Sequence, residues 1–294
     1  MSRARGVARR GYVDVPWGQV HYRHGGDADC PVLLILHQSP LSSATYDAVV
    51  EPVAQQGLRV IALDTPGFGM SDPPPRPWSI PEYAEAVWQV ADALDLPRLH
   101  LLGQHTGAII GAEAMMRAPE RVHRLILQGI PLYDEQERTE KKRSYAPGYV
   151  PARDGEHLRV IWDRVHGLYP RLTPEGANRQ VTEYLLTGPD YATAYRAVFD
   201  HHVDTAALDG LPIVLLHGAD DLLDRMTPQV RAALPHAPLV TIPGGTDFVA
   251  DEQPEAFAAA VAAQVRADLG QEGRHEARDS GSGRGGAARH DGAG

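Results

Sequence analysis

Short apolar runs alternate with segments of helical spacing along most of the chain. Continuous apolar runs are typical of strands buried on both faces of a parallel sheet; they fall at residues 32–36, 59–63, 99–102, 125–129, 213–216 and 239–242. Apolar residues spaced three or four apart predict amphipathic helices; these segments are 44–55, 81–94, 106–117 and 254–269. Because strands and helices alternate, the pattern predicts an α/β fold with a mostly parallel, doubly wound sheet.

Two stretches depart from this rhythm. Residues 12–22 alternate between apolar and polar, which predicts a pair of strands with Trp17 and Gly18 at the turn. Residues 133–205 contain no clean buried strand and are rich in tyrosine, which predicts an inserted helical cap whose aromatic residues form mainly its own core. The α/β core then comprises residues 12–132 and 206–269.

The two ends of the chain lack the apolar residues needed for a core. We expect residues 1–11 to be flexible and residues 270–294, which are rich in glycine and charged residues, to be disordered. No apolar run approaches the length of a transmembrane helix.

Composition narrows the setting and the partners. The 294 residues carry a net charge of -10, which argues against nucleic acid or an anionic membrane as a partner. Cys30 is the one cysteine, so an intrachain disulfide is impossible and we expect a cytoplasmic protein. A small-molecule substrate is the expected partner, and a homodimer is left open.

Five motifs follow one another at the ends of predicted strands. They are His37-Gln38-Ser39-Pro40, the loop 64–72 (DTPGFGMSD), the turn Gly103-Gln104-His105-Thr106-Gly107, the loop 217–221 (HGADD) and the segment 243–257 (PGGTDFVADEQPEAF). In this order they resemble the capped α/β-hydrolase family over residues 12–268. The resemblance implies an oxyanion turn at residues 37–40, a nucleophile elbow at 103–107, and catalytic acid and histidine positions at residues 221 and 247.

The residues at the implied catalytic positions depart from the family. His105 stands at the elbow, where the family has serine, cysteine or aspartate. Asp221 stands at the acid position, but Asp247 replaces the usual histidine. This set excludes the ordinary serine mechanism, because the elbow has no hydroxyl and residue 247 has no imidazole to deprotonate one. Ser39 remains an alternative, displaced nucleophile.

The exchange of imidazole and carboxylate suggests proton transfer. We expect a hydrogen bond between His105 and Asp247 that leaves the other ring nitrogen free as a general base or acid, assisted by Asp221. The backbone N–H groups of Ser39 and Thr106 are expected to stabilise an oxyanion or enolate. The resemblance makes such chemistry reasonable, since hydroxynitrile lyases and cofactor-free dioxygenases of the superfamily also transfer protons at this site.

The remaining expectations concern the pocket and the alternatives. Residues expected to line a pocket for a small, largely apolar substrate, of the kind found in secondary metabolism, are His37, Gln38, Gln104, Tyr133, Trp162, His202 and Phe248, although His37 also suits a structural role. No histidine or cysteine cluster has the spacing of metal ligands, so the sequence predicts neither a metal nor a cofactor. Two alternatives remain: a hydrolase in which His105 activates water or forms an acyl-imidazole, and a ligand-binding protein without catalysis.

Overall fold

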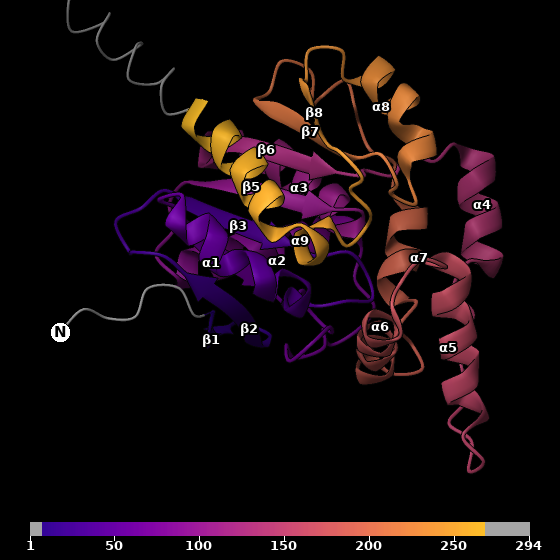
Figure 1. Cartoon of the computed structure of the whole chain (residues 1–294). Helices are drawn as coiled ribbons and strands as arrows, with labels where there is room; N and C mark the ends of the chain where they lie inside the picture. Colours follow the sequence, from indigo (N-terminus) through magenta and orange to yellow (C-terminus); the bar gives the residue numbers. More distant parts are fainter. Residues whose placement is uncertain (1–7, 268–294) are drawn as a thin grey trace, which may run out of the picture.

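One sheet runs through the centre of the molecule (Figure 1). The computed structural model describes residues 8–267, and within them eight strands pair in the order β1-β2-β4-β3-β5-β6-β7-β8. The strands are β1 (Arg9–Val15), β2 (Gly18–Gly25), β3 (Val32–Leu36), β4 (Arg59–Leu63), β5 (Leu99–Gln104), β6 (Val122–Gln128), β7 (Ile213–Gly218) and β8 (Leu239–Ile242). All pairs from β4 to β8 are parallel, which confirms the predicted α/β class.

The first two strands form an antiparallel hairpin at one edge of the sheet. They turn at Pro16 and Trp17, and β2 continues the sheet by pairing antiparallel with β4. The hairpin begins at Arg9, so residues 9–11 form part of a strand and the expected flexibility of residues 1–11 is wrong for them. The expected disordered tail, residues 270–294, lies outside the described residues.

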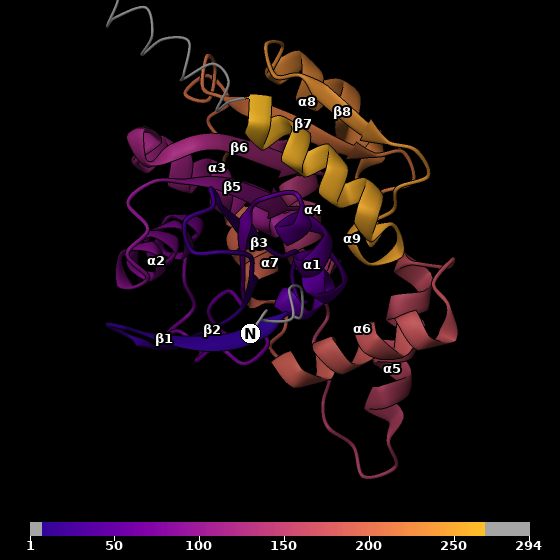
Figure 2. The ribbon, with the colours of Figure 1, turned by 60° about the vertical axis from the view of Figure 1, so that its left-hand side comes forward.

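Helices cover both faces of the sheet (Figure 2). On one face, α2 (Ile80–Ala93) and α3 (Thr106–Arg117) bury residues such as Tyr83 and Ile109. On the other face, α1 (Asp47–Gln55) and the helix over residues 254–267 bury Val49 and Phe257. Shorter elements complete the core: η1 (Ser43–Tyr46), η2 (Pro119–Arg121), η3 (Asp224–Met226), α8 (Thr227–Ala233) and α9 (Val249–Glu252).

The segment 133–205 forms four helices beside the carboxyl ends of the parallel strands (Figures 1 and 2). They are α4 (Glu135–Ser144), α5 (Glu156–Leu168), α6 (Pro174–Thr187) and α7 (Thr193–Asp200). Two hydroxyls tie this cap to the oxyanion turn: Tyr195 donates to the carbonyl of Ser39 at 2.6 Å, and Thr187 donates to that of Pro40 at 3.1 Å. The cap is therefore fixed directly over the end of β3.

None of the helices in the described chain combines the length and the apolar character needed to cross a membrane.

The backbones of β3, β5 and α3 approach one another too closely for side chains. A Cβ on Gly103 would lie 2.2 Å from the carbonyl oxygen of Gly107, and one on Gly107 would lie 2.3 Å from that of Leu36. These contacts are with backbone, which cannot rotate away. The two glycines thus allow α3 to start directly against the strand ends.

This close approach gives a stability prediction. Gly103→Ala should destabilise the protein by about 3 kcal/mol or more, because the new methyl group overlaps backbone atoms. Gly167→Ala is the matched control: Gly167 lies in α5 with no atom within 4 Å of the added Cβ. It should be neutral or stabilising by up to about 1 kcal/mol. Urea denaturation measures both, and equal midpoints for the two variants would contradict the proposed packing.

Candidate active site

His105 occupies a sharp turn between β5 and α3, as the sequence predicts. Its backbone has φ 47° and ψ -107°, which is a strained conformation for a residue with a side chain. Its N–H donates to the carbonyl of Gln128 at 2.9 Å, which holds the turn against β6. The turn places the imidazole at the carboxyl end of the sheet, beside the loops that follow β7 and β8.

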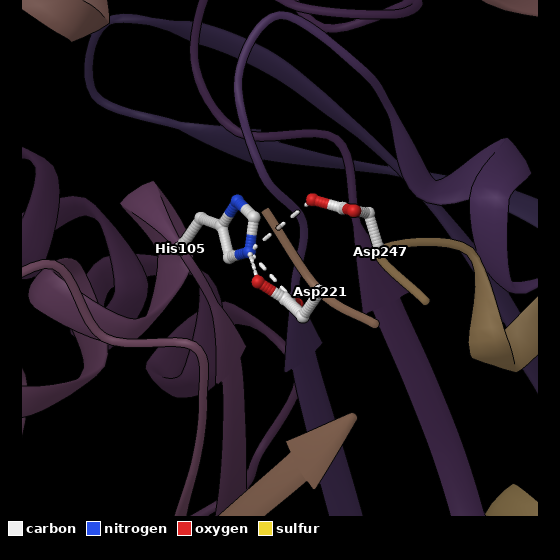
Figure 3. Close-up of side chains that lie close together, drawn as sticks. All are labelled: His105, Asp221 and Asp247. Carbon is white, nitrogen blue, oxygen red and sulfur yellow. Dashed lines mark hydrogen bonds and ion pairs between the residues drawn. The ribbon is translucent and has the colours of Figure 1, made fainter. Parts of the chain in front are cut away.

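Two carboxylates face the same nitrogen of His105 (Figure 3). Nε2 lies 3.0 and 3.1 Å from the two oxygens of Asp221 and 3.7 Å from Oδ1 of Asp247. The predicted grouping of the three residues is therefore observed, but the predicted hydrogen bond to Asp247 is wrong, because 3.7 Å is too long. The hydrogen-bonded partner is Asp221.

Backbone contacts explain why Asp221 is the partner. The loops after β7 and β8 are joined by a hydrogen bond from the N–H of Asp220 to the carbonyl of Gly245. Within them, Leu223 N–H donates to Oδ1 of Asp221 at 2.7 Å, and Leu222 N–H donates to Oδ2 of Asp247 at 3.1 Å. These bonds turn Asp221 toward the imidazole and hold Asp247 slightly behind it.

Gln104 holds the backbone of Asp247 from the α1 face of the sheet and does not line a pocket, contrary to expectation. Its Nε2 donates to the backbone carbonyl of Asp247 at 2.6 Å, and its Oε1 accepts from the hydroxyl of Tyr46 at 3.0 Å. Tyr46 belongs to the core on the α1 face of the sheet. Gln104 therefore points away from the cap and fixes the position of the β8 loop.

The close charges shift the pKa values of all three residues. Burial lowers the pKa of His105, but the charge and hydrogen bond of Asp221 and the charge of Asp247 outweigh it, so the pKa is raised. Burial opposes ionisation of Asp221, yet His105 and the Leu223 N–H hold its pKa below the usual value. Burial and the charge of Asp221 raise the pKa of Asp247 to about 6.

The second ring nitrogen of His105 has a different environment. No interaction is drawn from Nδ1 in Figure 3, and this nitrogen forms no hydrogen bond within residues 8–267. The side chain remains 11% exposed, whereas those of Asp221 and Asp247 are 3% and 5% exposed. A proton on Nε2 that is donated to Asp221 leaves a lone pair on Nδ1.

The expected oxyanion donors lie at adjoining strand and helix ends. Gly107 packs against the backbone of Leu36 and His37, which brings the start of α3 to the turn that contains Ser39. Thr106 is the first residue of α3, where a backbone N–H has no partner inside the helix. Ser39 is buried, and the Tyr195 hydroxyl holds its carbonyl. The role of these N–H groups stays a prediction.

The oxyanion turn itself is held by His37. Its Nδ1 lies 2.9 Å from the carbonyl of Gln38, and its Nε2 accepts from the backbone N–H of Thr65 at 2.9 Å. These bonds account for both ring nitrogens, so His37 acts as a structural link and is not available to a ligand. Gln38 is buried, and its Nε2 has no hydrogen-bond partner within the described residues.

The other expected pocket residues are scattered. Tyr133 and His202 line a crevice of about 230 Å³. It is not bordered by His105, Asp221 or Asp247. Trp162 is 37% exposed and its ring contacts that of His166 on the same helix at a tilt of 38°, so its placement in a pocket is wrong.

Phe248 is buried directly beside Asp247. Its ring meets that of Tyr169 edge to face at 4.8 Å. Burial and the charges of Asp247 and Asp221 raise the pKa of Tyr169, which places this cap residue over the site. The sequence analysis did not single out Tyr169 or Tyr195; the concentration of tyrosines in the cap was the available signal.

Gly129 is a further residue that the sequence analysis missed. It follows β6 with φ +58°, and a Cβ there would lie 2.8 Å from Nε2 of His105 and 3.2 Å from Oδ1 of Asp221. A side chain at this position would displace the imidazole. Its place as the last residue of the predicted strand 125–129, a glycine at a strand end like Gly103, was the signal that could have identified it.

Comparison with known proteins identifies the family. A family model described as the alpha/beta hydrolase fold matches residues 31–254. The class defined by the sheet and the elbow is thus the α/β-hydrolase fold, and the chain belongs to the α/β-hydrolase family.

Solved structures share this fold at low sequence identity. The enol-lactonase from Burkholderia xenovorans LB400 is 18% identical with a TM-score of 0.71, covering 87% of this chain and 100% of that one. Epoxide hydrolase A from Mycobacterium thermoresistibile is 16% identical with a TM-score of 0.70, covering 88% and 98%.

Curated relatives match over a shorter region. A haloalkane dehalogenase of Mycolicibacterium paratuberculosis is 33% identical over 123 residues, which are 41% of this chain and 41% of the relative. A 2-hydroxy-6-oxononadienedioate/2-hydroxy-6-oxononatrienedioate hydrolase of Escherichia coli K12 is 32% identical over 114 residues, 38% of this chain and 40% of the relative. The match therefore spans about two fifths of these proteins.

The raised pKa of Asp247 predicts how its removal changes stability with pH. Above about pH 6 the folded protein carries a buried Asp247 charge that the unfolded chain tolerates better, and a pKa of about 6 in place of 3.8 corresponds to about 3 kcal/mol. Asp247→Asn should therefore stabilise the protein at pH 8 by about 1–3 kcal/mol, and by much less at pH 4. Urea denaturation at the two pH values tests this, and an equal effect at both would contradict it.

Proposed function

We propose that this protein is an enzyme in which His105 transfers protons to and from a small, largely apolar substrate, without a covalent serine intermediate. The observation that carries the proposal is the asymmetry of the ring: Asp221 accepts from Nε2 while Nδ1 forms no hydrogen bond within the described chain. The membership in a family of enzymes supports catalysis in general.

In the proposed mechanism His105 acts in its neutral form, whose share is reduced because the nearby carboxylates raise the pKa of the imidazole. The lone pair on Nδ1 of that form accepts a proton from an activated C–H or O–H of the substrate. The imidazolium that forms is stabilised by its hydrogen bond to Asp221 and by the nearby charge of Asp247. The backbone N–H groups of Ser39 and Thr106 would stabilise the substrate anion. The proton then returns to the rearranged product or to its leaving group.

Buried aromatic residues of the cap and of the loop after β8 support an apolar substrate. Tyr169 and Phe248 pack together beside Asp247, and Tyr145 and Tyr195 pack edge to face at 5.2 Å. Such surfaces favour a ligand with a large apolar part and few polar groups.

A second candidate is hydrolysis, in which Nδ1 of His105 deprotonates a water molecule or attacks an acyl group itself. The observation that favours it is the name of one curated relative, since the Escherichia coli enzyme is a hydrolase. The third reading, a ligand-binding protein without catalysis, would show no dependence of any turnover on His105.

Two probes separate these candidates. Solvent deuterium exchange at the α-carbon of cyclohexanone, followed by NMR, reports proton abstraction, whereas release of 4-nitrophenol from short-chain 4-nitrophenyl esters reports hydrolysis. His105→Ala is the control in both assays. Exchange that depends on His105, with no ester turnover, supports the first candidate; His105-dependent ester turnover alone replaces it with the second.

The hydrogen bond between His105 and Asp221 predicts non-additive effects on activity. In whichever of the two assays the wild type is active, His105→Ala should lower the rate by about 10²–10⁴-fold, the range of general acid–base assistance. Asp221→Asn should cost nearly as much, and the double variant no more than His105→Ala, because the two side chains act as one unit. Asp220 is exposed on the same loop as Asp221 and pairs with Arg171, so Asp220→Asn should leave the rate unchanged. Full activity in His105→Ala would refute the proposal.

Serine-directed fluorophosphonates should leave the protein unlabelled, since the elbow has no hydroxyl. Intact-protein mass spectrometry after incubation with an excess of reagent measures the adduct. Stoichiometric modification that maps to Ser39 would instead support a displaced serine nucleophile.

A further inference from the structure

The three side chains around Nε2 have the donor atoms of a metal centre. Nε2 of His105 and one oxygen each of Asp221 and Asp247 all lie within 4.8 Å of one another. We infer that these three residues bind one divalent transition-metal ion of the zinc class. The sequence analysis predicts no metal, because the three residues are separated by more than a hundred and by twenty-six positions and only the fold brings them together.

The distances suit an ion of this size. Zinc bonds to histidine nitrogen and carboxylate oxygen are about 2.0–2.2 Å long, so two ligands at a tetrahedral angle lie about 3.4 Å apart. The observed separations from Nε2, 3.0 Å to Asp221 and 3.7 Å to Asp247, lie on either side of that value. The widest separation, at most 4.8 Å, has to close by up to about 1.4 Å. Changes in the side-chain torsion angles of the two aspartates would have to make this adjustment, because the loop backbones are held in place.

One ligand atom lacks a partner. Oδ1 of Asp247 is buried, points toward Nε2 of His105 (Figure 3), and accepts no hydrogen bond within residues 8–267. The other oxygen accepts from Leu222 N–H, which fixes the orientation of the carboxylate. A buried carboxylate oxygen without a partner is costly, and a metal ion in the triangle would satisfy it.

A residue without a side chain, Gly129, borders the three ligand side chains. Gly129 lies against Nε2 and Asp221, and a Cβ there would come within 2.8 Å of Nε2. Its positive φ also favours glycine. A side chain at this position would displace the imidazole and with it the proposed ligand nitrogen.

Charge and donor type select the ion. Two carboxylates and a neutral imidazole carry a charge of −2, which a divalent ion neutralises. An imidazole ligand and only two carboxylates favour zinc or cobalt over magnesium, which prefers six oxygen ligands.

Metal binding goes beyond the proposed function and alters it. Binding to Nε2 releases the proton shared with Asp221, and the remaining ring proton then resides on Nδ1 of His105. In that state Nδ1 has no lone pair with which to accept a proton from substrate. The ion would therefore compete with the proton-transfer reaction, and the two proposals have separate readouts.

Zinc binding to the full chain tests the site directly. Protein freed of metal with EDTA and then desalted is titrated with Zn²⁺ by calorimetry, and with Co²⁺ while visible absorption is recorded. We expect one tight site per chain and the absorption bands of four-coordinate Co²⁺, with no comparable binding of Mg²⁺. His105→Ala and Asp247→Asn should each weaken this site by at least about 100-fold, since loss of a direct ligand costs no less than loss of a supporting group.

Asp220→Asn is the matched control, because Asp220 is exposed beside Asp221 and pairs with Arg171. It should bind Zn²⁺ like the wild type. The inference is wrong if the wild type binds no more tightly than His105→Ala, or if Asp247→Asn and Asp220→Asn bind equally well. The cyclohexanone and ester assays run in EDTA test the proposed function independently, since they require no metal.

Discussion

The site depends on a backbone contact that admits no side chains. Gly103 and Gly107 bring the start of α3 against the ends of β3 and β5, and the chain between them can turn only with His105 at positive φ. That turn directs the imidazole toward the loops after β7 and β8, which a backbone hydrogen bond holds together. The meeting of His105, Asp221 and Asp247 is therefore a consequence of sheet geometry. The packing around His105 offsets the unfavourable free energy of its strained backbone conformation.

Within this frame, one imidazole faces two buried carboxylates through a single nitrogen. Only one carboxylate can accept the Nε2 proton with good geometry, and Asp221 does so because the Leu223 N–H also turns it toward the ring. Asp247 keeps one oxygen without a hydrogen-bond partner among the described residues, and its pKa rises to about 6. The same arrangement leaves Nδ1 as the ring atom able to react with a substrate, or Nε2 as a metal ligand if its proton is displaced.

The sequence predicts the sheet, the elbow and the three central residues, because each depends on a local signal. Buried strands appear as apolar runs, and the elbow glycines and acid loops occupy fixed places after them. The sequence did not predict which aspartate bonds to His105, since that depends on differences of less than 1 Å between two loops.

Two wrong placements have separate physical causes. Gln104 is the last residue of β5, and its direction depends on how the strand enters the turn; it reaches the far face, where Tyr46 holds it. Trp162 lies on a cap helix that packs through one side only, so an aromatic residue there need not be buried. In both cases the residue type suggested a pocket, and the direction of the side chain decided otherwise.

The free-energy cost of burying the Asp247 carboxylate bears on whether His105, Asp221 and Asp247 are only the remains of a family site that has lost its activity. A pKa of about 6 means that near neutral pH the fold carries about 3 kcal/mol of unfavourable free energy in this one carboxylate. A neutral residue of similar shape would avoid that cost while keeping the contact with Leu222 N–H, which needs only an oxygen acceptor. Gln104 and Tyr46 moreover hold the Asp247 backbone in place from the opposite face of the sheet. A charge that is held in position at a net cost is characteristic of sites that use the charge, either on a protonated imidazole or on a metal ion.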